Sequence, residues 1–225
     1  MEKLIITIAT TGSGTPLSKC PNLAITPAQI ADEVYECYQA GASVAHIHVR
    51  DEDGGRSMDF DRFKETVERI RDKCDILINL TTSGMEFSEE VRLKPLSLKP
   101  DLASFNAGSM NFGENVFVNT ESMMKRFAQA MEEYHVKPEI ECYDAGMVEN
   151  SLRLHREGYL KGPLHYQFVL GVKGGMEASA RNLMFLRESL PADATWGAVG
   201  LGRQSVPISS MAIHLGGNVR VGMED

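Results

Sequence analysis

The sequence predicts an α/β fold in which eight parallel strands close into a (β/α)8 barrel, the TIM barrel architecture. Along its 225 residues, short apolar runs alternate with amphipathic segments of helical spacing. No apolar run is joined to the next by a two-residue hairpin, so the strands need crossover helices and the sheet is expected to be parallel. Eight such units favour a closed barrel over an open doubly wound sheet, which remains the alternative because periodicity cannot establish closure.

The eight strand candidates lie at residues 4–10, 43–49, 75–82, 101–109, 137–144, 164–171, 194–201 and 218–224. The first helical segment shows the clearest boundaries. Thr26 is a candidate N-cap, Pro27 suits the first helical position and Gln29 completes a capping box. The chain has no obvious linker, so residues 1–225 are expected to form one domain. It ends with the eighth strand, so we expect the barrel's last helix to be missing. Either the chain is a fragment or a partner covers that face.

Composition narrows the function classes. The net charge of −8 gives no indication of a basic face that would bind nucleic acid. No apolar run approaches the length of a membrane span. The N-terminus lacks a signal-peptide pattern. The four cysteines are scattered and contain no CxxC pair, which favours a reduced, cytoplasmic protein over a disulfide framework.

Two histidines give the clearest chemical signal. His46 and His48 are two residues apart near the end of the second strand, so they are expected to share a face at the barrel mouth. Glu224 lies at the end of the eighth strand, and barrel closure brings that strand close to the second. Two imidazoles and one carboxylate with an open fourth position form a catalytic zinc arrangement. The competing interpretations are hydrogen-bonded histidines and a solvated terminal carboxylate.

Other strand ends also carry polar residues, which are costly to bury unless they are paired or used. They include Asn79, Thr81, Ser104, Asn106, Glu139, Glu141, His165 and Gln167. Individually each is more often a packing residue than a catalytic one. Two glycine-rich loops follow the sixth and seventh strands, and Gly174, Lys173 and Arg203 in them are weak candidates for holding phosphate.

Nine segments along the chain resemble the β-keto acid cleavage enzymes. They are ATTG, PNLAITP, AHIHVRDEDGGRS, INLTTSG, KPDLASFNAGSMNFG, PEIECYDAGM, LHYQFVLGVKGGM, TWGAVGLGR and GGNVRVGMED. The resemblance implies a (β/α)8 barrel that binds a divalent metal, usually zinc, and assembles as a homotetramer. It also implies a reaction in which a β-keto acid and acetyl-CoA give acetoacetate and a new acyl-CoA.

The resemblance also implies roles for individual residues. His46, His48 and Glu224 correspond to the metal ligands, Asp225 to the general base and Arg220 to its partner. Thr81 stands at the position of a small hydroxyl residue, and Glu141 matches a buried glutamate. The substrate-pocket motif contains Ser104, Asn106 and Ser109, and the glycine-rich loops with Gly174, Lys173 and Arg203 are candidates for binding acetyl-CoA.

One position departs from the family pattern. Gly14 stands where the aminohexanoate-cleaving type has an acidic residue that holds the substrate ammonium, so we expect a substrate without that amino group. Two other functions remain open. One is a different zinc enzyme on the same barrel, a hydrolase or aldolase without CoA. The other is a non-catalytic binding protein or inactive fragment.

Overall fold

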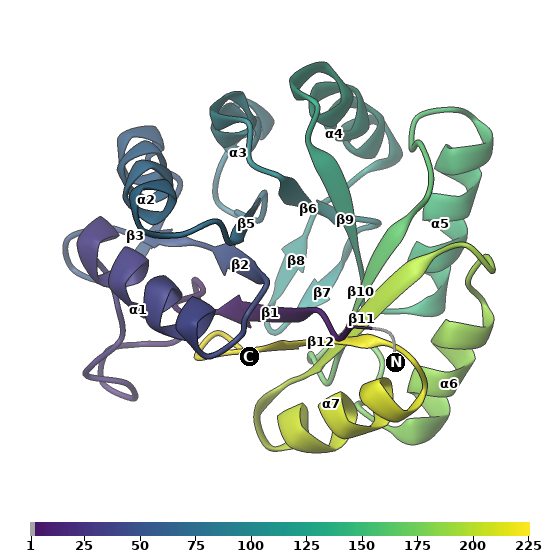
Figure 1. Cartoon of the computed structure of the whole chain (residues 1–225). Coiled ribbons are helices and arrows are strands. Elements are labelled where there is room, and N and C mark those ends of the chain that lie inside the picture. The colour runs from purple at the N-terminus through teal and green to yellow at the C-terminus, as the bar shows by residue number, and fades with distance from the viewer. Residues whose placement is uncertain (1–2) are drawn as a thin grey trace.

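The computed structural model describes residues 3–225, in which eight parallel strands form a closed barrel (Figure 1). Going round the barrel, the strands follow in chain order, and the last pairs with the first to close it. Their bounds are Ile6–Ala9 (β1), Val44–Ile47 (β2), Leu77–Leu80 (β5), Leu102–Asn106 (β6), Lys137–Cys142 (β9), His165–Leu170 (β10), Thr195–Gly200 (β11) and Asn218–Val221 (β12). The prediction of a closed barrel is therefore confirmed, and the open sheet is excluded.

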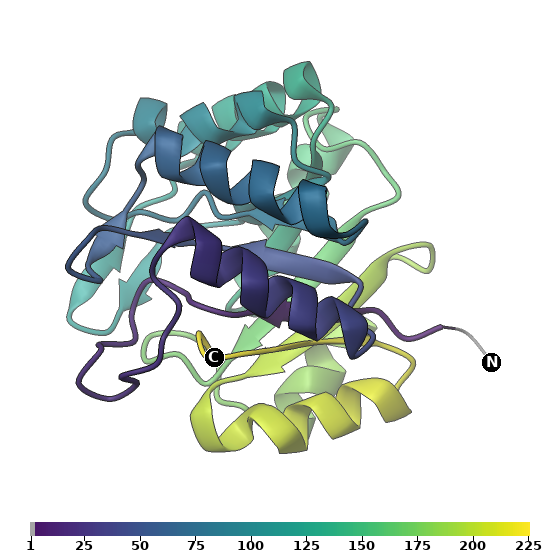
Figure 2. The same ribbon diagram turned by 60° about the vertical axis from the view of Figure 1, so that its left-hand side comes forward.

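In the described part of the chain, seven α-helices pack around the outside of the barrel (Figures 1 and 2). They are Pro27–Gln39 (α1), Phe60–Lys73 (α2), Glu89–Leu93 (α3), Glu121–Tyr134 (α4), Ala145–Arg156 (α5), Ala180–Glu188 (α6) and Ser205–His214 (α7). Short 3-10 turns cover Lys94–Leu98 and Gly202–Gln204. The expected capping box is present at α1, where Thr26 and Gln29 satisfy each other's backbone N–H groups. Within residues 3–225, no helix has both the length and the apolar character to cross a membrane.

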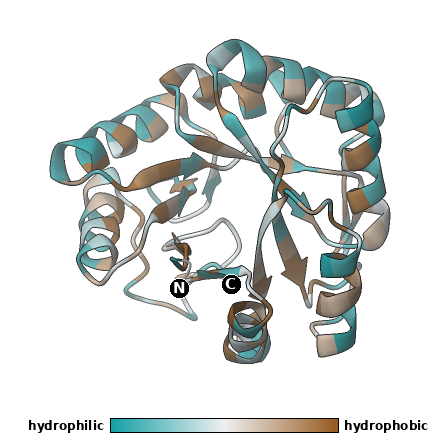
Figure 3. Cartoon of the chain, turned by 45° about the vertical axis from the view of Figure 1, so that its right-hand side comes forward, coloured by the Kyte–Doolittle hydropathy of each residue, from teal (hydrophilic) through white to brown (hydrophobic). Residues whose placement is uncertain are grey.

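Hydrophobic side chains of the strands and helices meet between the two layers. Figure 3 shows the strands as mostly hydrophobic, while the helices carry hydrophobic residues on one side and polar residues on the other. On α2, Phe63 and Ile70 have no exposed surface. Truncating a residue buried in this way costs about 3 kcal/mol of stability. This packing fixes the strand ends, and hence the side chains at the barrel mouth.

Two small antiparallel sheets lie in loops outside the barrel. Val49–Arg50 (β3) pairs with Arg56–Ser57 (β4), and Met110–Phe112 (β7) pairs with Asn115–Phe117 (β8). The sequence analysis did not predict them, because strands of two or three residues are too short to show a period. Both hairpins contribute residues to a pocket at the barrel mouth.

A buried arginine holds each hairpin in place. The Arg50 guanidinium donates to the carbonyls of Thr11, Gly12 and Gly54, and so joins the loop after β1 to the β3–β4 hairpin. In the same way Arg92 donates to the carbonyls of Thr82 and Val118 and to the Asn119 side chain. Its guanidinium also stacks on Phe117 and Phe127, and burial lowers its pKa to about 10.

Candidate active site

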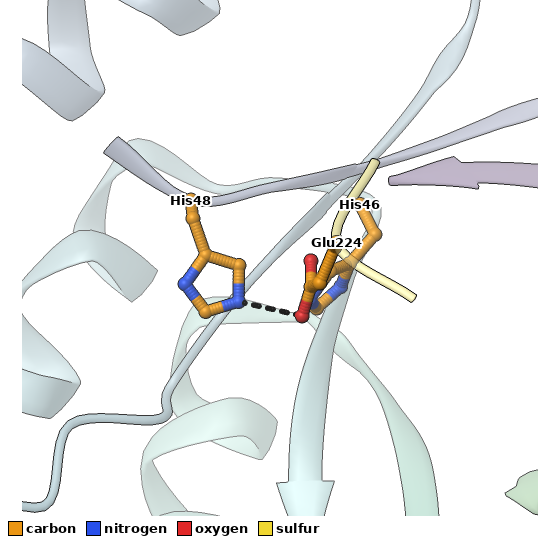
Figure 4. A group of neighbouring side chains, drawn as sticks. All are labelled: His46, His48 and Glu224. Carbon is orange, nitrogen blue, oxygen red and sulfur yellow. Dashed lines mark ion pairs between the residues drawn. The ribbon is translucent and has the colours of Figure 1, made fainter. Parts of the chain in front are cut away.

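His46 and His48 point into the same space at the barrel mouth (Figure 4). His46 belongs to β2, and His48 follows directly after the strand ends at Ile47. Both are buried, with ring centroids 5.1 Å apart. Burial is the main cause that lowers the pKa of His46 well below its ordinary value. The imidazole is therefore neutral, which is the form that binds a metal.

Glu224 reaches the histidines by a different path from the one expected. The eighth strand ends at Val221, so the predicted strand over 218–224 was too long. The chain then turns over the end of β1, where the Glu224 N–H donates to the Ala9 carbonyl at 3.2 Å. Gly222 permits this approach, since a Cβ there would lie 2.0 Å from the Ala9 oxygen. A β carbon on Gly12, which has φ of +55°, would likewise meet the Glu224 side chain.

The three side chains form a group with the spacing of a metal site. Glu224 Oε1 lies 3.3 Å from His48 Nε2, and Oε2 lies 3.8 Å from His46 Nε2. Their ligand atoms all fall within 4.8 Å of one another, and Glu224 Oε2 has no hydrogen-bond partner. Burial opposes ionisation of Glu224, but Arg220 and the histidines outweigh it and hold its pKa well below the usual range. The residues present therefore fit a divalent ion with three protein ligands.

A second group of possible ligands lies deeper in the barrel. His46, Glu139 and Glu141 also satisfy the spacing, and all three are buried. Glu139 does not line the pocket, whereas His46, His48 and Glu224 all do. A catalytic ion must keep a position open to substrate, so the group that contains Glu224 is the better candidate.

Arg220 on β12 is the centre of a buried charge cluster. Its guanidinium contacts Glu141 at 3.1 Å, Glu224 at 2.8 Å and both oxygens of Asp225 at 2.9 and 3.1 Å. With all three carboxylates ionised, one guanidinium leaves two negative charges uncompensated. A divalent cation supplies that charge. Without it, burial raises the pKa of Glu141 to about 7 and that of Asp225 to about 6.

These groups face a cavity of about 230 Å³. Its inner end carries the charged and ligating residues: His46, His48, Glu141, Arg220, Glu224 and Asp225. Its outer end is formed by loops and by the two hairpins, and is mostly apolar. The structure therefore brings together six of the residues that the sequence analysis singled out.

Four other predicted residues lie behind the pocket surface. Three of them use their side-chain hydroxyl to accept a hydrogen bond from a backbone N–H. The donors are Ser83 for Thr81, Thr82 for Ser104 and Asn119 for Ser109. The Asn106 amide lies 3.4 Å from the hydroxyl of Ser83, which does line the pocket. Their predicted roles in substrate binding or catalysis remain predictions.

Gly174, Lys173 and Arg203 also lie outside the pocket lining, although Val172 and Leu201 of the same two loops belong to it. A β carbon on Gly174 would lie 1.9 Å from the Asn111 carbonyl oxygen, so a glycine is needed there for packing against the β7–β8 hairpin. Lys173 pairs with Glu114 on the same hairpin at 2.5 Å. Arg203 is exposed in the 3-10 turn after β11. Binding of acetyl-CoA by Gly174, Lys173 and Arg203 remains a prediction.

Several pocket residues were not predicted from the sequence. Tyr143 donates to Glu141 at 3.3 Å, and its spacing of two residues from Glu141 was a signal that could have revealed it. Ser83, Arg56 and Glu86 also line the pocket. They lie in irregular loops or a two-residue strand, where no period predicts direction.

Comparison with known proteins supports the same assignment. The family model for the beta-keto acid cleavage enzymes matches residues 3–225. The chain belongs to this family. It is 43% identical over 228 aligned residues to the 3-keto-5-aminohexanoate cleavage enzyme of Fusobacterium nucleatum subsp. nucleatum, covering 100% of this chain and 83% of that protein.

Relatives with other names match over similar lengths. The 3-oxoadipate:acetyl-CoA acetyltransferase of Cupriavidus necator is 35% identical over 229 aligned residues, covering 100% of this chain and 80% of that protein. Among solved structures, the apo form of ObcA superposes with a TM-score of 0.80 at 20% identity. That match covers 91% of this chain and 56% of ObcA, and it supports the barrel fold alone.

Proposed function

We propose that this chain catalyses a zinc-dependent exchange in which a β-keto acid and acetyl-CoA give acetoacetate and a new acyl-CoA. The observation that carries the proposal is the convergence of His46, His48 and Glu224 beside Asp225 and Arg220 in one pocket. Family membership supports the reaction type, and the acetyl-CoA-dependent relative from Cupriavidus necator supports the co-substrate.

Zinc is the metal that the donor set favours. Two imidazole nitrogens and one carboxylate oxygen are typical of catalytic zinc, which keeps a fourth position open. When bound, the ion supplies Lewis acidity, which polarises the keto oxygen and acidifies the carbon between the keto group and the carboxylate. His46, His48 and Glu224 would hold it, and the lowered pKa values of His46 and Glu224 favour the neutral imidazole and the ionised carboxylate that bind a metal.

Asp225 is the proposed base. It lines the pocket, and Arg220 contacts both of its oxygens, which favours the ionised carboxylate that a general base needs. Its carboxylate would take a proton from the carbon between the two carbonyl groups of the acid. Arg220 donates hydrogen bonds to both Asp225 oxygens and so orients the base. Its positive charge would also stabilise the enolate that develops. Glu141 holds the other side of Arg220, while Thr81 holds Ser83.

The remaining steps of the exchange involve no change of oxidation state and need no redox cofactor. The acid's α-carbon forms a bond to the acetyl carbonyl carbon, and the CoA thiolate leaves. The thiolate next attacks the acid's original keto carbon, and the bond between that carbon and the α-carbon breaks. The original acyl group leaves as acyl-CoA. The carbanion that remains takes back one proton and becomes acetoacetate.

The substrate is proposed to lack an amino group. Gly14 lines the pocket and brings no charge to it. An ammonium group on the substrate would therefore find no carboxylate at this position. The relative from Fusobacterium nucleatum is named for an amino-substituted acid, so a preference of this chain for that acid would contradict the proposal.

Assembly and location are further parts of the proposal. We expect residues 1–225 to act as one domain within a homotetramer in the cytoplasm, where the four cysteines stay reduced; all four are free in the structure. Light scattering tests the assembly, and a monomer at micromolar concentration would contradict it.

The experiment that tests the reaction combines metal-analysed protein, acetyl-CoA with carbon-13 in the acetyl group, and β-keto acids. The expected product is acetoacetate that carries the label, together with the acyl-CoA of the acid. His46→Ala should abolish it, while His214→Ala, which alters an exposed histidine on α7, should not. Bound zinc without labelled acetoacetate would favour a hydrolase or aldolase that does not use CoA. Absence of both would favour a non-catalytic chain.

A further inference from the structure

The outer end of the pocket has an apolar wall. Figures 1 and 2 show the hairpins and loops at one end of the barrel that carry it. We call these side chains the apolar wall: Met85, Phe87, Phe112, Phe117, Val172 and Leu201. Phe117 and Val172 are buried, and the other four are half-buried. An apolar group on a ligand would be removed from water against this wall, whereas a charged group would lose its hydration.

The charged side chains at this end neutralise each other. Outside the inner cluster, and among residues 3–225, the charged side chains that line the pocket are Arg56 and Glu86. Arg56 Nη1 lies 3.8 Å from Glu86 Oε1, and each side chain is 42% exposed. The pair joins the β3–β4 hairpin to the loop after β5. Because the opposite charges face one another, each lowers the attraction of the other for a charged group on a ligand.

Gly14 leaves room beside this pair. Arg56 also donates to the carbonyl of Ser13, the residue before Gly14, at 3.4 Å. A β carbon placed on Gly14 would meet no atom within 4 Å, so the space beside it is open. This part of the pocket therefore offers volume without net charge.

We propose that the pocket selects β-keto acids whose acyl chain is uncharged and apolar. The inference rests on the proposed function and names the substrate class for that reaction. A terminal carboxylate would have to displace Glu86 from Arg56, and an ammonium group would have to displace Arg56 from Glu86. Either charge would also be desolvated beside the apolar wall, whereas an alkyl chain gains from the same contact.

Three acids with six-carbon chains separate these possibilities. They are 3-oxohexanoate, 3-keto-5-aminohexanoate and 3-oxoadipate, which differ in the charge of the chain beyond the keto group. We expect kcat/KM for 3-oxohexanoate to exceed that of both charged acids by about 10-fold or more, the discrimination typical of an apolar pocket. A higher value for either charged acid would overturn the inference while leaving the reaction intact. Acetoacetate from none of them would instead overturn the proposed function.

Two variants test the charge pair with opposite expected signs. Glu86→Gln frees Arg56 and should raise kcat/KM for 3-oxoadipate relative to 3-oxohexanoate. We expect a change of about 10-fold, because the freed guanidinium gains one close contact with the substrate's terminal carboxylate. Arg56→Gln frees Glu86 and should raise the relative value for 3-keto-5-aminohexanoate. Glu65→Gln breaks an exposed pair with Arg69 on α2, away from this pocket, and should change neither ratio. If both pocket variants leave the ratios unchanged, the charge pair does not set the preference.

Discussion

The two ends of the pocket are built in different ways. At the inner end, His46, Glu141 and Arg220 lie on barrel strands and are buried, and hydrogen bonds or ion pairs connect most of the charged groups. At the outer end, Arg56 and Glu86 lie in loop structures and remain substantially exposed. The inner end is held by barrel strands and by contacts of Arg220 with Glu141, Glu224 and Asp225. The outer end depends on two short hairpins outside the barrel. We therefore expect changes at the inner end to affect the chemistry and changes at the outer end to affect substrate preference.

The largest expected effect comes from removing a ligand at the inner end. His48→Ala should weaken zinc binding by more than about 100-fold, since even residues that only orient a ligand are worth 10- to 100-fold. Acetoacetate formation should fall in parallel. Competition with a chromogenic chelator measures the affinity. Unchanged affinity in His48→Ala would show that the ion binds elsewhere, for example at Glu139 and Glu141.

A pH effect on stability is expected from the floor of the barrel below the inner end. Burial lowers the pKa of His165 to about 4, from 6.5 in the unfolded chain, and its Nδ1 lies 2.8 Å from the Thr195 hydroxyl. The folded state therefore binds the proton less well. The contribution is fully present above pH 6.5 and is lost as pH falls towards 4, by up to about 3 kcal/mol. Urea unfolding at pH 7 and pH 4 measures it. His165→Gln should lack this loss, and parallel losses in both proteins would contradict the account.

Asn79 is expected to orient His46. The two residues are paired in register on β5 and β2, and His46 Nδ1 and Asn79 Oδ1 are both buried with no hydrogen-bond partner. The Asn79 amide nitrogen donates to Glu139 at 2.7 Å, which fixes the direction of the side chain. Asn79→Ala should weaken zinc binding by about 10- to 100-fold, since it frees the imidazole to rotate. Isothermal titration with zinc measures this change. Wild-type affinity in the variant would show that Asn79 is only a packing residue.

The smallest effect is expected at the outer end. Phe112→Ala removes one ring of the apolar wall and should raise KM for 3-oxohexanoate by about 10-fold, with kcat nearly unchanged, because it removes binding without touching the reacting atoms. Steady-state kinetics gives both constants. A fall in kcat with constant KM would place Phe112 in the chemistry and remove the distinction between the two ends.

The contrast between the strand-borne inner end and the loop-borne outer end also explains how much of the fold and site could be predicted from the sequence. Strand and helix alternation predicted the barrel, and a spacing of two residues predicted that His46 and His48 share a face. The predicted closure of the barrel correctly placed Glu224 beside the two histidines. The predicted extent of the eighth strand, to residue 224, was wrong. The turn after Val221 depends on contact with Ala9, which no local pattern reveals. The Arg56–Glu86 pair joins segments far apart in sequence and has no periodic signal.

The central claim is that the ion held by His46, His48 and Glu224 is required for the acyl exchange. It is tested most directly by adding zinc back to chelator-treated protein while measuring bound metal and labelled acetoacetate in the same samples. The account predicts that activity rises in proportion to bound zinc and stops at one ion per chain, while Glu224→Gln binds less zinc and stays inactive at the same added concentration. Full activity in protein shown to be free of metal would contradict it.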